Sequence, residues 1–121
     1  MHNDWSKPIG ELRGPLRKLR TGAPDVMKAF AAIAQAATEA NVLDSKTKEL
    51  IALAIAVAIR CDECIAFQVK SALEQGASRE EVLEVLGIAI YMGAGPAVMY
   101  ASHAIEAYDQ LGAAKRVEAV G

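Results

Sequence analysis

Cys61 and Cys64 are separated by two residues and are the only cysteines in the chain. A thiolate attacks peroxides and disulfides, and a second cysteine within reach resolves the oxidised first one before its oxidation becomes irreversible. The C-x-x-C pair is therefore typical of redox chemistry, although two inert buried thiols or half of a metal site are alternatives. Zinc usually takes four ligands, and neither His2 nor His103 lies at a ligand-like spacing, so we expect no metal and no cofactor.

An acidic residue precedes the pair at a fixed distance. Glu49 comes twelve residues before Cys61, just ahead of an uncharged run at 50–59. Along a straight helix Glu49 would lie about 18 Å from Cys61, so it could act on the cysteines only through an intermediate group. If the next helix folds back antiparallel, Gln68 would lie between Glu49 and the cysteines along the helix axis. The alternative for Glu49 is an exposed acid paired with a lysine.

Other ionisable side chains could take part in the same chemistry. His103 lies on a helix face of small residues and is the best candidate for a general base. The alternative is that His103 only packs against a neighbouring helix. Arg60, next to Cys61, is the nearest cation that could hold an acidic substrate. Asp62 and Glu63, between the cysteines, work partly against thiolate formation, because nearby negative charge raises a thiol pKa.

Helices are expected to position these residues. Alanine is abundant, aromatic residues are only 5%, and β-branched residues form no alternating run, so we predict an all-α fold. The expected helices cover about 24–40, 44–60, 62–75, 79–92 and 96–111, which gives a five-helix bundle. Prolines and glycines interrupt residues 1–22, which should form an N-terminal arm with one short helical turn, whereas residues 23–121 should form a single domain.

Local signals mark several helix ends. Pro24 suits a first helical turn, and Asp44 or the serine after it suits an N-cap. Gly76 suits a left-handed C-terminal position, and the serine-to-glutamate pattern at 78–81 is a capping box. Gly112 is expected to end the last helix.

Two apolar surfaces are predicted to lie in the core. Val26, Phe30 and Ile33 recur at helical spacing and form one stripe. The run at 50–59 is apolar on all sides, so its helix should be surrounded by other helices. The glycine-rich segment at 93–96 should interrupt the helix before it.

Charge and composition exclude some partner classes. A net charge of -2 and a pI near 5.7 give no reason to expect nucleic acid or an anionic membrane. The longest uncharged run is about half of the ~20 apolar residues that a membrane span needs. No signal-peptide pattern is present at the start, so we place the protein in the cytoplasm, where thiols without a redox or metal role stay reduced. A small subunit with so apolar a helix should bury further surface as a homo-oligomer.

Three segments carry a resemblance to a known family, and they read KTKELI at 46–51, CDECI at 61–65 and GASREE at 76–81. They resemble the carboxymuconolactone decarboxylase family, and more narrowly its branch that contains alkylhydroperoxidase D. That branch carries a glutamate, eleven residues, C-x-x-C, three residues and a histidine. Glu49, Cys61 and Cys64 match this pattern, whereas Gln68 occupies the histidine position. The resemblance spans roughly residues 24–111.

The resemblance implies an all-helical subunit in trimers or hexamers. It also implies an antioxidant thiol oxidoreductase that takes a hydroperoxide or disulfide substrate and a thiol electron donor, with Cys64 as the more exposed sulfur. Its catalytic set would be Cys61, Cys64, Glu49 and Gln68, with His103 and Arg60 as possible accessories. Glutamine cannot take up a proton near neutral pH, so the activity should be weakened. The alternatives are a helical module that binds a small molecule without catalysis, and a decarboxylase-like lyase that Arg60 would serve.

Overall fold

Helices make up almost all of the chain in the computed structural model, which describes residues 4–120 and the side chains up to residue 118. Residues 1–3 and 121 lie outside this description. The prediction that His2 is not a metal ligand therefore concerns a residue outside the described range. The helices are α1 (Ser6–Glu11), α2 (Arg13–Gly22), α3 (Pro24–Thr38), α4 (Ser45–Ala58), α5 (Asp62–Glu74) and α6 (Arg79–Val120). No strand occurs within residues 4–120, and the predicted all-α fold is confirmed.

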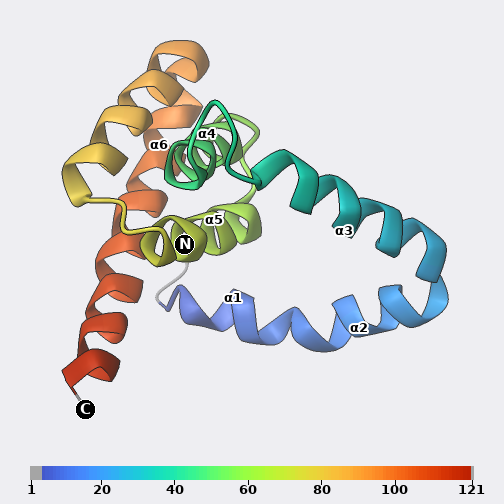
Figure 1. The fold of residues 1–121 in the computed structure, drawn as a ribbon. Helices are drawn as coiled ribbons and strands as arrows, with labels where there is room; N and C mark the ends of the chain where they lie inside the picture. The colour runs from blue at the N-terminus through green and yellow to red at the C-terminus, as the bar shows by residue number, and fades with distance from the viewer. Residues whose placement is uncertain (1–3, 121) are drawn as a thin grey trace.

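The core forms where α4, α5 and α6 pack against one another (Figure 1). Its largest fully buried aliphatic side chains are Leu53 and Val57 from α4, Ile65 and Val69 from α5, and Val82 from α6. Burial of each such side chain stabilises the fold by roughly 1.5–3 kcal/mol. The short helix α1 packs against α5, so the N-terminal segment is attached to this core.

The helix ends that the sequence predicts from neighbouring residues are present in the structure. The Asp44 carboxylate accepts the Thr47 N–H at 2.7 Å and caps α4. Ser78 and Glu81 form the reciprocal capping box, at 2.9 Å and 3.1 Å. Gly76 follows α5 with φ +78°, a conformation that glycine adopts without a Cβ penalty. Each N-cap is worth about 1 kcal/mol, so these bonds fix where the core helices start.

The N-terminal arm is more regular than predicted. We expected one short helical turn before Gly22, but α1 and α2 cover almost the whole segment. Pro8 and Pro15 are each the third residue of their helix. The first turn of a helix has no intrahelical acceptor for its N–H groups, so a proline there loses no hydrogen bond. The prolines therefore start these helices and do not interrupt them.

Helix α6 bends in the middle and continues further than predicted. Ala94 has non-helical angles (φ 53°, ψ -138°), so the predicted interruption at 93–96 is present as a kink. The predicted end at Gly112 is wrong, because α6 runs on to Val120. Gly112 is buried, and a Cβ added there would lie 3.6 Å from the Leu73 side chain. This distance is an ordinary van der Waals contact, so Gly112 lies inside α6 beside α5 without a steric need for glycine.

The two glycines around Ala94 predict opposite mutational effects. A Cβ at Gly93 would lie 2.8 Å from the Cβ of Ala97, which is buried and cannot rotate away, whereas a Cβ at Gly95 meets nothing within 4 Å. Gly93→Ala is expected to destabilise the fold by about 1–3 kcal/mol in urea unfolding. Gly95→Ala, the matched control, should be neutral or stabilising by up to about 1 kcal/mol. Equal stability of the two variants would contradict the predicted clash.

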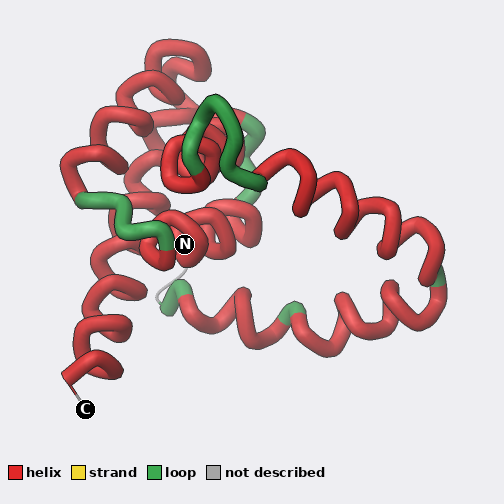
Figure 2. The backbone as a smooth tube through the Cα atoms, in the orientation of Figure 1, coloured by secondary structure: helices red, strands yellow, loops and turns green. Residues whose placement is uncertain are grey.

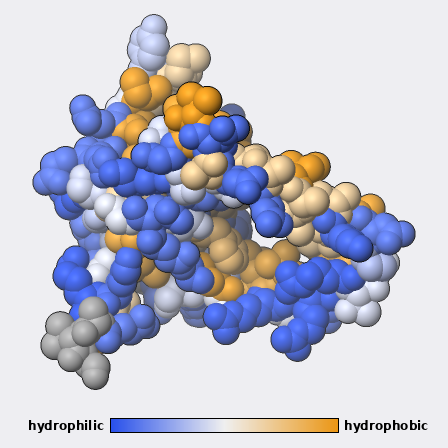
Figure 3. All heavy atoms as spheres, viewed as in Figure 1, coloured by the Kyte–Doolittle hydropathy of each residue, from blue (hydrophilic) through white to orange (hydrophobic). Residues whose placement is uncertain are grey.

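Of the two apolar surfaces predicted as core, the α3 stripe is exposed in the single chain and the run at 50–59 is buried on one face only. No side chain of α3 is buried, and α4 buries one face only. The reason is topological: α1, α2 and α3 form a loop that leaves the body and returns at α4 (Figures 1 and 2), so no helix of the same chain covers these surfaces. Figure 3 shows hydrophobic residues along α3 in this view. The exposed residues are Val26, Phe30 and Ile33 of α3 and Ile51 and Ile55 of α4, with Ile59 just beyond it.

Among the described helices, α6 has the length and composition of a membrane span over Arg79–Glu118. The core helix of a soluble protein passes the same test, and the kink at Ala94 divides this one. Only 22% of its most apolar window is buried within the chain, so α6 also presents an apolar surface.

Candidate redox site

The two cysteines are joined by a disulfide at the start of α5. Their Cα atoms lie 5.2 Å apart. Cys61 is the N-cap residue, and its Sγ accepts the N–H of Cys64 at 3.2 Å. Both residues are half-buried, and Cys64 also packs against the core. The same sulfur therefore forms the disulfide and caps a helix.

A tight turn after α4 brings Cys61 to this position. Arg60 has φ +61°, in the left-handed region. The turn is held by two backbone bonds, from the N–H of Arg60 to the carbonyl of Val57 and from the N–H of Cys61 to that of Ala56, each 3.2 Å long. Left-handed backbone costs a non-glycine residue roughly 1–2 kcal/mol, which these bonds offset. The Arg60 side chain is exposed.

The position of Cys61 favours its thiolate form once the disulfide is reduced. A helix N-terminus carries partial positive charge, and its free N–H groups stabilise an anion. Asp62 and Glu63, in the first turn of α5, place negative charge beside the sulfurs. The Asp62 side chain, however, forms a hydrogen bond with a residue of α6.

His103 of α6 contacts the segment that carries the two cysteines, residues 60–64, which we call the redox turn. Its Nδ1 lies 2.8 Å from Oδ1 of Asp62, with side-chain exposures of 15% and 23%. Because a carboxylate only accepts hydrogen bonds, Nδ1 carries the hydrogen, and Nε2 is the ring nitrogen that can take up or release a proton. The Tyr100 ring packs on the imidazole with centroids 5.1 Å apart. The sequence singled out His103, but not Asp62 as its partner.

Trp5 is a part of this site that the sequence analysis did not identify. Its ring is completely buried, 5.7 Å from the His103 ring between centroids. Its backbone N–H donates to Oε1 of Gln110 at 2.9 Å. The available signal was a lone tryptophan within a polar segment, since such a ring rarely stays in water.

Glu49 and Gln68 occupy different places relative to the disulfide. Gln68 follows Cys64 by one helical turn, and its Oε1 is buried with no hydrogen-bond partner among the described residues. Burial, and then the charge of Glu74, raise the pKa of Glu49. Glu74 ends α5, about 15 Å along the helix from Cys64, so Glu49 lies toward the far end of the α4–α5 pair. It therefore has no direct contact with the sulfurs.

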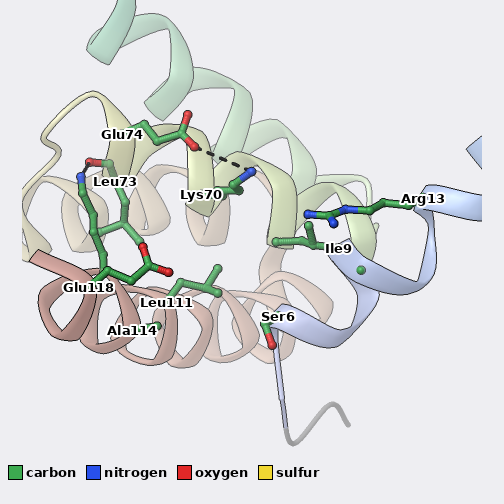
Figure 4. A pocket seen from close by; sticks show the side chains of 11 residues that line it. Ser6, Ile9, Arg13, Lys70, Leu73, Glu74, Leu111, Ala114 and Glu118 are labelled. Atoms are coloured by element: carbon green, nitrogen blue, oxygen red, sulfur yellow. Dashed lines mark hydrogen bonds and ion pairs between the residues drawn. The ribbon is translucent and has the colours of Figure 1, made fainter. Parts of the chain in front are cut away.

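A pocket of about 480 Å³ lies away from the disulfide, between α1, α5 and the end of α6 (Figure 4). Apolar side chains and charged side chains line it together, and Lys70 pairs with Glu74 there at 3.8 Å. None of the predicted site residues lines this pocket. Across residues 4–118 there is likewise no group of three or more His, Cys, Asp or Glu side chains that could hold a metal ion.

The family is decided by comparison with known proteins. The sequence model of the carboxymuconolactone decarboxylase family matches residues 24–107. The chain belongs to this family. The family resemblance predicted from three short segments is thereby confirmed, and the Cys61–Cys64 pair fits the predicted C-x-x-C pattern.

Relatives of this carboxymuconolactone decarboxylase family member match over nearly their whole length. An uncharacterized protein of Cupriavidus necator is 41% identical over 93% of this chain and 100% of its own. A Haemophilus influenzae protein, also uncharacterized, is 42% identical over 89% of this chain and 96% of its own.

Solved structures show the same fold. A carboxymuconolactone decarboxylase family protein from Legionella pneumophila has a TM-score of 0.86 and 46% identity, over 88% of this chain and 95% of that one. A Thermotoga maritima member has a TM-score of 0.82 and 28% identity, over 93% of this chain and 95% of that one. The Thermotoga protein is described as having a possible involvement in antioxidative response.

Proposed function

We propose that this protein is a thiol-dependent oxidoreductase that reduces hydroperoxides or exchanges disulfides through Cys61 and Cys64. The observation that carries the proposal is the capped disulfide: Cys61 Sγ is bonded to Cys64 Sγ and also accepts the backbone N–H of Cys64 in the first turn of α5. A cysteine pair at a helix N-terminus has the features that a reversible thiol centre needs. The antioxidative description of the Thermotoga relative supports the same class of chemistry.

In the proposed cycle the Cys61 thiolate attacks the terminal oxygen of a hydroperoxide. The S–O bond forms, the O–O bond breaks, and the alkoxide leaves as an alcohol after taking up a proton. Cys64 then attacks the Cys61 sulfenic acid, which releases water and forms the disulfide. A thiol donor supplies the two electrons that restore both thiols. One hydroperoxide is thus reduced to an alcohol and water for each disulfide formed.

We assign the first attack to Cys61. The resemblance favours Cys64 as the more exposed sulfur, but both cysteines are half-buried and Cys64 packs against the core. Only Cys61 has its sulfur at the N-cap position, where the helix stabilises a negative charge. Cys64 then acts as the resolving thiol.

His103 and Asp62 replace the family histidine in this proposal. Gln68 cannot exchange a proton near neutral pH, whereas Nε2 of an imidazole oriented by a carboxylate can. We propose that His103 takes the thiol proton of Cys61 and returns it to the leaving alkoxide. Gln68 offers its buried Oε1 as an acceptor, and Glu49, whose pKa is raised, acts at a distance through water.

The test is the rate of thiol loss when the reduced protein meets an organic hydroperoxide. Wild-type protein should lose two thiols per chain and form no lasting sulfenic acid. Cys64→Ser should give a Cys61 sulfenic acid that a dimedone probe traps, whereas Cys61→Ser should react slowly and give little adduct. A Gln75→Ala control at the far end of α5 should behave as wild type. Unchanged turnover in both serine variants would refute the proposal.

A helical module that binds a small molecule is the second candidate. It is favoured by Gln68, because a buried oxygen without a donor among the described residues suits a ligand that donates a hydrogen bond. The two candidates differ in one measurement. If wild-type thiol loss is slow and Gln68→His accelerates it, this chain has lost most of the peroxidase activity that the family resemblance implies. The protein would then be better described as a module that binds a small molecule.

A further inference from the structure

Helix α3 presents an apolar stripe that no residue of the described chain covers. The exposed fractions of Val26, Phe30 and Ile33 are 68%, 63% and 64%, and no side chain of this 15-residue helix is buried. These residues lie on one face, at spacings of four and three. Isolated helices of this length are marginally stable in water, so α3 needs a surface to pack against.

An apolar groove of complementary character lies on the body of the molecule. It has a volume of about 310 Å³ and runs between α4 and the first half of α6. Ile55, Ile88 and Met92 are 54%, 62% and 73% exposed in it. Six of its lining residues are Ile51, Ile55, Ala58, Val85, Ile88 and Met92. Apolar grooves of this kind accept amphipathic helices through residues spaced like those of the stripe.

We infer that the α3 stripe of one copy of this chain docks in the α4–α6 groove of a second copy. The stripe has no route to the groove of its own chain, because α3 approaches the body only at its C-terminal end, where it leads into α4 (Figure 1). A contact between two different surfaces forms a closed ring when the rotation between neighbouring copies closes, and such a ring suits the trimer or hexamer that the family resemblance implies. The groove reaches Ala58, three residues before Cys61, so the docked helix borders the redox turn.

Charge favours a second copy as the occupant. Residues 4–23 contain five basic and two acidic side chains, whereas residues 24–121 contain eight basic and thirteen acidic ones. Helix α2, which packs beside α3, carries Arg17, Lys18 and Arg20. Glu84 lies one turn before Ile88 on the α6 wall of the groove and is exposed. The basic arm and the acidic body attract each other, and the acidic rim disfavours an anionic lipid surface.

Light scattering tests the contact from both sides. The wild-type chain should be oligomeric, and Phe30→Glu and Ile88→Glu should each lower the mass toward a monomer. Both side chains are exposed in the single chain, so the core of α4, α5 and α6 should stay folded, and circular dichroism should show no loss of helix beyond that of the undocked α3. Gln35→Glu, with the same charge on the opposite face of α3, should keep the wild-type mass. A monomeric wild type, or wild-type mass in both variants, would overturn the inference.

Disulfide cross-linking tests the pairing directly. Two chains are made in a Cys61→Ser, Cys64→Ser background, one with Phe30→Cys and the other with Ile88→Cys. Their mixture should give a covalent dimer on mild oxidation, whereas Gln35→Cys with Ile88→Cys should not. Absence of the first dimer, or equal yield from the second mixture, would refute the contact. This background lacks the redox pair, so the result is independent of the proposed thiol chemistry.

Discussion

Replacing His103 with glutamine is expected to slow thiol loss from the reduced protein by about 10²–10⁴ fold, the usual cost of losing a general base. The imidazole Nδ1 is 2.8 Å from Oδ1 of Asp62, the residue that follows Cys61 in the chain. Glutamine keeps the size and a hydrogen bond to Asp62 but cannot carry a proton. The measurement is the stopped-flow rate of thiol loss with an organic hydroperoxide.

A structural role for His103 would give different results. The His103→Gly variant should recover part of its rate when imidazole is added, which a packing defect would not allow. Ser102→Ala is the control, because that exposed hydroxyl donates only to the carbonyl of Met99 one turn earlier. A His103→Gln rate within twofold of wild type would remove the histidine from the mechanism.

The largest effect on stability is expected at Trp5. Trp5→Ala should lower the free energy of unfolding by about 3–5 kcal/mol, because it empties the space of a fully buried ring. The lost ring also supports the imidazole of His103, so the rate of thiol loss should fall as well. Urea unfolding followed by circular dichroism measures the first effect without relying on the fluorescence of the lost tryptophan.

The control for Trp5 lies on the same N-terminal arm. Leu19 of α2 is 53% exposed, so Leu19→Ala should change stability by no more than about 0.5 kcal/mol. Trp5→Phe, which keeps an aromatic ring of smaller size, should fall between the two. If Trp5→Ala were no more destabilising than Leu19→Ala, Trp5 would not belong to the core in solution.

Features that depend on neighbouring residues were predictable from the sequence. The capping box at 78–81, the left-handed Gly76 and the Asp44 cap each involve groups within three residues of one another. The two cysteines were identified for the same reason. Local hydrogen bonds follow from residue type and spacing, so one sequence is enough to predict them.

Features that depend on distant partners were not predictable. The contact of His103 with Asp62 spans 41 residues, and the burial of Trp5 depends on α6. The apolar stripe of α3 looked like core because periodicity shows that a face is apolar but not which surface covers it. Gly112 has the residue type of a helix end, but it lies inside α6, where it packs beside Leu73 of α5. Each of these features depends on packing between helices.

The bond from Trp5 to Gln110 has a consequence for how the protein is made. It joins residues 105 positions apart, and the chain is synthesised from its N-terminus. Trp5, at the start of the first helix, can therefore form this bond only after Gln110 has left the ribosome. Contacts that close such long loops form late in folding. The cysteines are thus translated well before His103, whose ring contacts Asp62 between them, and the redox turn is completed only late in folding.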